Sequence, residues 1–186
     1  MRKLVISEFI SLDGVVDSPG GGDHPEAGWT FKRVGADETL YEDAGRDQDE
    51  TSALLMGRVS YDEFAPVWPS MEEFAGYNAM PKYVVSTTLV NPEWSNTSVL
   101  RSLDEVRDLK ARDGGDIHVP GSPTLVKSLQ AAGLVDQYNL LIYPVLLGAG
   151  KRLFDDTDGT AFAKLTLIEH KVYTNGVVRA IYDARN

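Results

Sequence analysis

Two hydrophobic periods alternate along the chain. Short runs rich in valine, isoleucine and tyrosine, such as KLVISEFI, ALLMG, KYVV and DIHVP, are each followed by a longer, more polar segment. In several of these segments, including RVSYDEF, SLDEVRDLKA and SPTLVKSLQAA, apolar residues recur three to four positions apart. The first pattern favours β-strands and the second favours helices. Strands that alternate with helices predict an α/β fold whose sheet is largely parallel.

The last third of the chain, from Gln137 onward, has a different pattern. The runs QYNLLIYPVLLG, KLTLIEHKVYT and VVRAIYDAR are separated by loop segments rather than by helical ones. The last two runs are joined by Asn175-Gly176, a pair typical of a type I′ hairpin turn, which needs positive φ at both central positions. We therefore expect antiparallel strands, ending in a hairpin, to complete the sheet.

No long linker, repeat or low-complexity segment divides the 186 residues, so we expect a single domain over residues 1–186. The longest apolar stretch, Leu140 to Gly150, is interrupted by Pro144 and is far shorter than the roughly 20 residues that span a bilayer. The N-terminal residues lack a signal-peptide pattern and are interpreted as the first strand. Residues 17–28 are expected to form a loop that either covers a pocket or serves only as a connection.

Composition narrows the classes of function. The chain has no cysteine, which excludes disulfides, thiolate metal sites and cysteine nucleophiles. Its formal net charge of −10 disfavours nucleic acid as a partner. His24-Pro25-Glu26 matches half of a zinc deaminase signature without its cysteine half, and the acidic cluster that begins at Asp155 lacks EF-hand spacing. We therefore expect a cytoplasmic protein with no metal site and no membrane segment.

Three strand-to-helix junctions carry small and hydroxyl side chains. In an open α/β sheet such junctions meet at the carboxyl edge of the strands, where free N–H groups at helix starts attract anions. Glycine lets a phosphate approach the backbone, hydroxyls donate hydrogen bonds, and Arg58 adds a permanent cation. Helix capping also explains each junction taken alone, but three in succession favour a dinucleotide site. The residues are Gly57, Arg58 and Ser60 at the first junction, Ser86 and Thr87 at the second, and Gly121, Ser122 and Thr124 at the third.

An ordinary Rossmann domain is not indicated, because the G-x-G-x-x-G fingerprint is missing after the first strand. Instead, SLDGVV, LLMGRVSYDEF, KYVVSTTL, GGDIHVPGSPTLVKSL and GLVDQYNLLIYPVLLGAGKRLF together resemble the dihydrofolate reductase-like family. That family is typified by the reductase (C-terminal) domain of the bifunctional riboflavin-biosynthesis deaminase-reductase. The resemblance, over about residues 2–183, implies a dihydrofolate reductase-like fold with helices flanking a central, mostly parallel sheet. It also implies NADPH as hydride donor and a homodimer.

The same resemblance assigns the three junctions, and one further loop, to the cofactor. A serine, Ser122, stands where the family usually has a second glycine. The cofactor-binding residues that the resemblance implies are Gly14 in the loop over the nicotinamide, Gly57, Arg58 and Ser60 in the turn for the pyrophosphate and 2′-phosphate, Ser86 and Thr87 in a second 2′-phosphate loop, and Gly121, Ser122 and Thr124 in the pyrophosphate turn.

Three residues are candidates for the substrate side of the site. Asp13 lies in the loop that, in the family, covers nicotinamide and substrate, and it is our candidate for polarising the substrate or delivering a proton. Asp13-Gly14 is equally an ordinary turn, and water could serve as the proton source. Trp29 is a candidate aromatic wall for the substrate or a core residue. Asp37, or its neighbour Glu38, occupies roughly the position of the acidic residue that binds the pteridine in dihydrofolate reductases.

The resemblance and the junctions together predict an NADPH-dependent reductase of a small heterocyclic substrate. The substrate would be pterin-like or ribosylamino-pyrimidine-like, as for dihydrofolate reductase or 5-amino-6-(5-phosphoribosylamino)uracil reductase. The cofactor would carry the hydride, while the protein orients the reactants and excludes water. The alternative is a non-catalytic dinucleotide-binding protein that keeps the fold without turnover, because fold alone does not establish activity.

Overall fold

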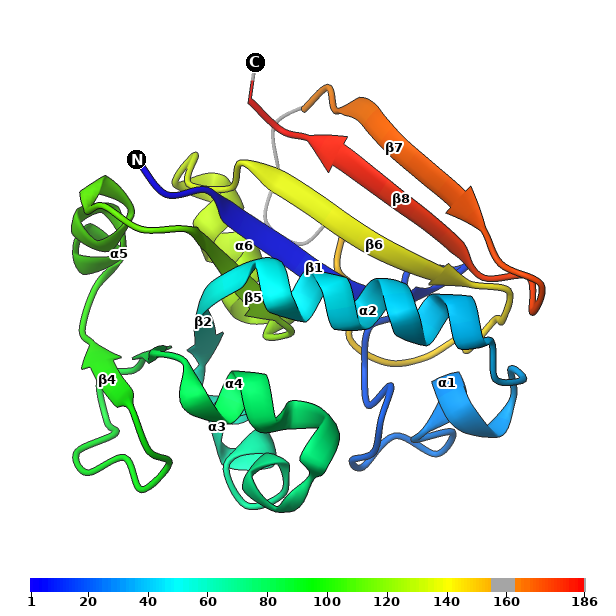
Figure 1. The fold of residues 1–186 in the computed structure, drawn as a ribbon, viewed down its shortest axis with the longest axis horizontal. Coiled ribbons are helices and arrows are strands. Elements are labelled where there is room, and N and C mark those ends of the chain that lie inside the picture. Colours follow the sequence, from blue (N-terminus) through cyan, green and yellow to red (C-terminus); the bar gives the residue numbers. More distant parts are fainter. Residues whose placement is uncertain (155–162, 186) are drawn as a thin grey trace.

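The computed structural model describes residues 1–154 and 163–185, and their strands form one eight-stranded sheet (Figure 1). The acidic cluster that begins at Asp155, which lacks EF-hand spacing, lies outside the described residues. In the sheet the strands follow the order β4-β3-β2-β5-β1-β6-β8-β7. Their bounds are β1 Leu4–Ser11, β2 Thr51–Gly57, β3 Lys82–Val85, β4 Thr97–Leu100, β5 Asp116–Pro120, β6 Gln137–Tyr143, β7 Thr166–Val172 and β8 Val178–Asp183.

The pairing confirms the predicted fold class. The strands from β4 to β6 are parallel to their neighbours, whereas β8 runs antiparallel to both β6 and β7. The predicted type I′ turn in the hairpin is wrong, because Asn175 does not have positive φ. Instead Tyr173 N–H donates to Val177 O, and the loop between them ends in Gly176 with φ of +84°. This is a three-residue loop in which glycine takes the left-handed position.

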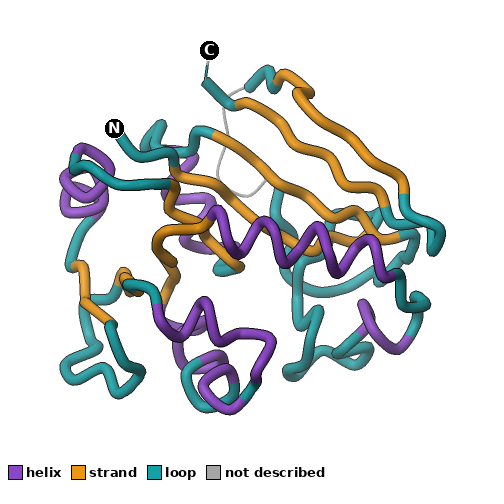
Figure 2. The backbone as a smooth tube through the Cα atoms, viewed as in Figure 1, coloured by secondary structure: helices purple, strands orange, loops and turns teal. Residues whose placement is uncertain are grey.

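Helices cover both faces of the sheet. Among the described residues the helices are α1 Trp29–Lys32, α2 Glu38–Glu50, α3 Arg58–Phe64, α4 Ala75–Ala79, α5 Leu103–Ala111 and α6 Pro123–Ala131, with short 3-10 turns at Trp68–Ser70 and Glu72–Phe74. Figure 2 shows α2 lying across the strands on one face of the sheet. None of the helices in the described part of the chain is both long and apolar enough to cross a bilayer.

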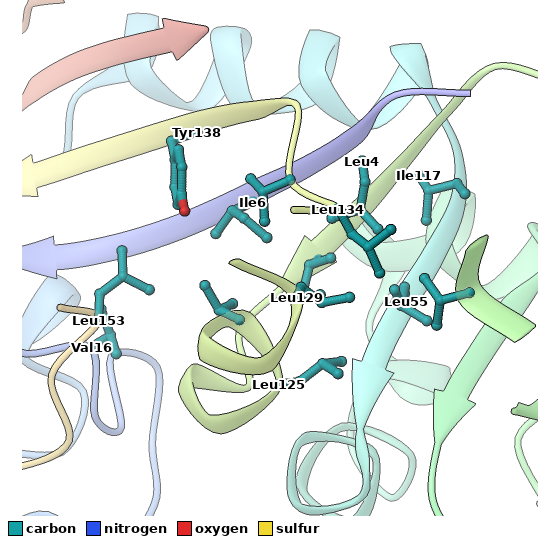
Figure 3. Packing of buried hydrophobic residues seen from close by; sticks show 14 of the residues in the cluster. Leu4, Ile6, Val16, Leu55, Ile117, Leu125, Leu129, Leu134, Tyr138 and Leu153 are labelled. Carbon is teal, nitrogen blue, oxygen red and sulfur yellow. The ribbon is translucent and has the colours of Figure 1, made fainter. Parts of the chain in front are cut away.

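The alternation of side chains along β1 divides the core between these two faces. Ile6 and Ile10 belong to a buried cluster with Val126 and Leu129 of α6, which Figure 3 shows from close by. Phe9, on the opposite face, packs with the cluster that contains Leu40 of α2. Both faces of the central strands are therefore buried, as is usual for a parallel sheet with helices on each side.

Candidate functional site

The loops that follow β1, β2, β3 and β5 lie side by side at one edge of the sheet. These strands are consecutive in the sheet order and mutually parallel, so their carboxyl ends meet there. The topology therefore brings together the junctions that begin at Gly57, Ser86 and Gly121, together with the Asp13-Gly14 turn. Such an edge is where open α/β sheets bind ligands.

Ser122 connects the loop after β5 to the loop after β2. Its hydroxyl accepts a hydrogen bond from the Gly57 N–H at 2.8 Å and lies 2.6 Å from the Ser60 hydroxyl. The Ser122 side chain does not cap α6, although Ser122 is the N-cap residue. The first N–H groups of α6 therefore receive no bond from the N-cap side chain, and such groups attract anions.

Two glycines in these loops permit a close approach of the chains. A Cβ atom at Gly57 would lie only 3.0 Å from the Ser122 hydroxyl oxygen. Gly121 has φ of +96°, a conformation that favours glycine, and Ser122 itself has φ of +73°. These two consecutive positive φ angles turn the chain sharply before α6 begins.

Arg58, the first residue of α3, reaches from the β2 loop toward the β3 loop. Its Nε lies 2.8 Å from both carboxylate oxygens of Asp62, one helical turn later. One terminal nitrogen lies 3.5 Å from the Thr88 hydroxyl. Asp62 thus holds the guanidinium beside the loop of Ser86 and Thr87, where it is available to an anion.

Ser86 organises that loop rather than offering a free hydroxyl. Its Oγ accepts hydrogen bonds from the N–H groups of Thr88 at 3.2 Å and Leu89 at 3.1 Å. Thr87 and Thr88 are exposed next to it, and the side chain of Thr124 is exposed at the start of α6. The hydroxyls open to a ligand in this region are therefore those of Thr87, Thr88 and Thr124.

The sequence analysis missed a second guanidinium at this loop. Arg101 donates from Nη1 to the Ser86 carbonyl at 2.7 Å. It follows β4, and β4 pairs with β3 so that Leu100 lies opposite Val85. The sequence signal is present, because Arg101 directly precedes Ser102, the N-cap of α5, but only the strand pairing places it beside Ser86.

Asp13 fastens the β1 loop to the loop after β6. Its carboxylate accepts hydrogen bonds from the Ser11 hydroxyl at 2.7 Å and from the N–H groups of Leu147 at 3.1 Å and Gly148 at 2.8 Å. The Ser11 bond, and then those backbone bonds, lower the pKa of Asp13 to about 2. The carboxyl is therefore ionised at neutral pH, which does not fit the predicted role of proton donor. The adjacent Gly14, with φ of +86°, accepts a hydrogen bond from the Leu153 N–H at 3.1 Å.

Trp29 is a core residue and not a substrate wall. Its exposed fraction is 0%, and its ring packs edge-to-face on Tyr143 with 5.3 Å between centroids. Its indole N–H donates to the Asp17 carbonyl at 2.9 Å. The prediction of a ligand-facing ring is wrong because this hydrogen bond and the apolar cluster bury the whole side chain.

Asp37 links α2 to the C-terminal hairpin and does not face a ligand. As the N-cap of α2 it accepts a hydrogen bond from the Leu40 N–H at 3.1 Å. Its other oxygen accepts from the N–H of Thr174 at 2.8 Å and from the Thr174 hydroxyl at 2.5 Å. The pteridine-binding role does not fit, because both oxygens are already bonded within the protein. The alternative, Glu38, is exposed at the first turn of α2.

The loop of residues 17–28 packs against the loop that follows β6. Asp17 accepts a hydrogen bond from the Lys151 N–H at 3.2 Å, and the His24 ring lies 3.0 Å from the Ala149 carbonyl. The loop therefore flanks the same edge of the sheet as the candidate site. No group of three or more metal-ligating His, Cys, Asp or Glu side chains occurs among residues 1–154 and 163–185.

Glu8 is a second residue that the sequence analysis missed. It interrupts the apolar run of β1, it is only 6% exposed, and its Oε1 has no hydrogen-bond partner in the described structure. Burial raises its pKa well above the ordinary value, which favours the protonated form of the carboxyl. Ser7 pairs with Pro120 on β5, which puts Glu8 beside the start of the Gly121 turn.

A family model described as the RibD C-terminal domain matches residues 2–179. The chain belongs to the RibD C-terminal domain family. This membership confirms the resemblance proposed from the sequence and supports a reductase-type activity. It does not distinguish one substrate from another.

Relatives of this RibD C-terminal domain are known from sequence and from structure. It is 27% identical over 191 residues to the Bacillus subtilis protein YyaP, covering 97% of this chain and 94% of YyaP. It is 23% identical over 160 residues to YwjB of the same organism, covering 83% of this chain and 84% of YwjB. Both relatives are described as uncharacterized proteins.

Two solved structures share its fold. A candidate riboflavin biosynthesis protein from Shewanella sp. PV-4 superposes with a TM-score of 0.75 at 20% identity, with 100% of each chain covered. A pyrimidine reductase-like protein from Corynebacterium diphtheriae superposes with a TM-score of 0.61 at 14% identity, with 100% of this chain and 92% of that chain covered. At these identities the likeness shows the shared fold.

Proposed function

We propose that the protein is an NADPH-dependent reductase that transfers a hydride to a small heterocyclic substrate. The main support for this proposal is that two guanidinium groups, those of Arg58 and Arg101, contact the loop that follows β3. This loop lies beside the turns that contain Gly57 and Gly121. Both groups are permanent cations with donors that match a phosphate. Membership of the RibD C-terminal domain family supports the same conclusion.

In this proposal each loop binds one part of the cofactor. The pyrophosphate lies against Gly57, Gly121 and the free N–H groups at the start of α6. The 2′-phosphate of NADPH lies between Arg58 and Arg101, within reach of the exposed Thr87 and Thr88. NADH lacks this phosphate, so the two arginines favour NADPH.

The loop of Asp13 and Gly14 covers the nicotinamide in this proposal. Asp13 acts as a positioning residue, because its ionised carboxylate holds the loops after β1 and β6 together. The bound cofactor supplies the hydride, and these loops orient the reactants and exclude water. Glu8, beside the Gly121 turn, is a buried acid whose Oε1 has no hydrogen-bond partner in the described structure.

We propose a pterin-like or ribosylamino-pyrimidine-like acceptor. The descriptions of the two structural neighbours, in riboflavin biosynthesis and as a pyrimidine reductase-like protein, support the pyrimidine class. We further propose a homodimer, as the family resemblance implies, and a cytoplasmic location, with which the absence of cysteine is consistent. The non-catalytic alternative gains weight from one observation, which is that Trp29 and Asp37 are committed to internal contacts.

Turnover with defined acceptors tests the proposal. NADPH oxidation is followed at its nicotinamide absorbance with dihydropterin and ribosylamino-pyrimidine acceptors, in parallel with NADH. We expect acceptor-dependent oxidation that is faster with NADPH. Tight NADPH binding without oxidation in the presence of any of these acceptors would favour the non-catalytic alternative.

A further inference from the structure

A separate polar cavity lies between α2 and the sheet, with a volume of about 350 Å³. This volume lies at the lower end of the range for small-molecule sites. The side chains around it come from one helix and four strands. The lining residues are Asp43, Arg46, Asp47 and Glu50 of α2, Asp116 and His118 of β5, Gln137 and Asn139 of β6, Ile168 and Glu169 of β7, and Arg179 and Ile181 of β8.

The repeat of side-chain directions along α2 and along the strands explains why these residues face one cavity. Residues three and four positions apart on α2 share one helix face, and alternate residues on a strand share one sheet face. The lining residues of β5 and β6 come from the beginnings of these strands, whereas the candidate cofactor loops follow their ends. The cavity is therefore distinct from the cofactor site.

Its lining is predominantly acidic, with five carboxylates against two guanidinium groups. Arg179 is already neutralised, because it donates to both oxygens of Asp47 at 2.6 and 2.7 Å. Asp43 accepts hydrogen bonds from Lys171 at 2.6 Å and from the Tyr173 hydroxyl at 2.8 Å. The carboxylates of Asp116 and Glu50 make no hydrogen bond or ion pair within the described residues. The cavity therefore holds uncompensated negative charge.

A buried histidine in the lining of this cavity has an unused ring nitrogen. His118 is 6% exposed, and its Nδ1 lies 3.2 Å from the Ser7 hydroxyl. Its Nε2 has no partner in the part of the chain that the structure describes. Burial lowers the pKa of His118, so the ring is neutral at pH 7 and adds no positive charge. Beside it, Gln137 donates to Asn139 Oδ1 at 2.8 Å, which leaves the Gln137 carbonyl oxygen free to accept.

We propose that this cavity binds a small organic cation that carries an ammonium or guanidinium group. The unpaired carboxylates of Asp116 and Glu50 attract the positive charge, and His118 and Gln137 supply neutral hydrogen-bonding groups. An anion would be repelled by the acidic lining, and an apolar molecule would leave these polar groups without partners. The described residues contain no group of ligands that could hold a metal ion, so an organic cation fits better than a metal.

Calorimetric titration with agmatine tests this site, because agmatine carries a guanidinium at one end and a primary ammonium at the other. We expect saturable binding to the full chain at low salt. Because a charge-assisted hydrogen bond is lost, Asp116→Asn and Glu50→Gln should each raise the Kd about tenfold. Neither carboxylate has a partner in the described structure, so both variants should keep the fold and the melting temperature.

The control variant is Asp108→Asn, which removes an exposed carboxylate from α5, outside the cavity. It should leave the Kd for agmatine unchanged, and uncharged 1,4-butanediol should not bind. The proposal is overturned by absence of agmatine binding up to roughly 10 mM, a concentration at which even weak ligands saturate. The proposal is also overturned if butanediol binds as tightly as agmatine. It is overturned as well if Asp116→Asn and Glu50→Gln weaken agmatine binding no more than Asp108→Asn does. None of these results depends on the proposed reductase activity.

Discussion

At the scale of single residues, one hydroxyl group determines how two of the candidate cofactor loops fit together. Ser122 bonds the Gly57 N–H and the Ser60 hydroxyl, and it does so from a left-handed conformation. Its side chain is thereby drawn away from the start of α6, which leaves the first N–H groups of that helix without an N-cap partner. A single side chain thus both joins the loops and leaves donors for an anion.

Replacing this hydroxyl should weaken the fold and the site together. In Ser122→Ala the half-buried Gly57 N–H loses its acceptor, which we expect to cost about 1 to 2 kcal/mol of unfolding free energy. Affinity for NADPH and NADH should fall by similar factors, because the loop contacts parts that both cofactors share. Urea unfolding and cofactor titration measure the two effects. Ser128→Ala, which removes an exposed hydroxyl bonded only within α6, is the control and should change neither. A Ser122→Ala protein as stable as this control would contradict the assigned role.

At the scale of elements, the position of α2 is determined by polar contacts at both of its ends. Asp37 bonds the first turn of α2 and Thr174 in the hairpin, and Asp47 near the other end bonds Arg179 of β8. These contacts hold α2 against strands that follow it by more than a hundred residues in the sequence. The helix therefore depends on the C-terminal hairpin for its placement.

The Asp37 contact should make stability depend on pH in a defined direction. The Thr174 hydroxyl, followed by backbone N–H groups, lowers the pKa of Asp37. A carboxyl whose folded pKa is lowered stabilises the fold above its unfolded pKa of about 4 and loses that contribution as pH falls through the folded pKa. We expect Asp37→Asn to lower the urea midpoint at pH 7, with the difference from wild type shrinking below about pH 4.

Urea melts of both proteins at pH 7, 5 and 3 measure this trend. Asp49→Asn, which changes an exposed carboxylate on the same helix, is the matched control. A difference between Asp37→Asn and wild type that grows as the pH falls would contradict the proposed contact.

At the scale of the whole molecule, the sequence predicted the architecture more completely than the site. Strand and helix periods are local properties, and they indicated the parallel sheet and the final hairpin. The junction residues Gly57 and Gly121 were recognisable because strand order in this fold brings such turns to one edge. The roles of Trp29 and Asp37 could not be predicted from neighbouring residues in the sequence. Asp37, for example, accepts a hydrogen bond from Thr174, which is 137 residues away.

The same reasoning explains the residues that were missed. Arg101 reaches Ser86 only because β4 pairs with β3, and a four-residue strand gives little sequence signal of that pairing. Glu8 was visible as a carboxylate within an apolar strand, and its burial could have been predicted from the alternation alone. The hairpin turn was misassigned because Asn-Gly fits both a type I′ turn and the end of a three-residue loop.

The central claim is that three adjacent loops bind NADPH and that Arg58 binds its 2′-phosphate. The most direct test is titration of the protein with NADPH and NADH, followed by energy transfer from its three tryptophans to the nicotinamide. We predict tighter binding of NADPH, and Arg58→Ala should weaken NADPH by roughly tenfold or more while leaving NADH nearly unchanged. Arg107→Ala, which removes an exposed arginine that also pairs with a carboxylate on its own helix, should alter neither. Equal loss of NADPH and NADH affinity in Arg58→Ala, or no binding of either cofactor to the wild-type protein, would contradict the claim.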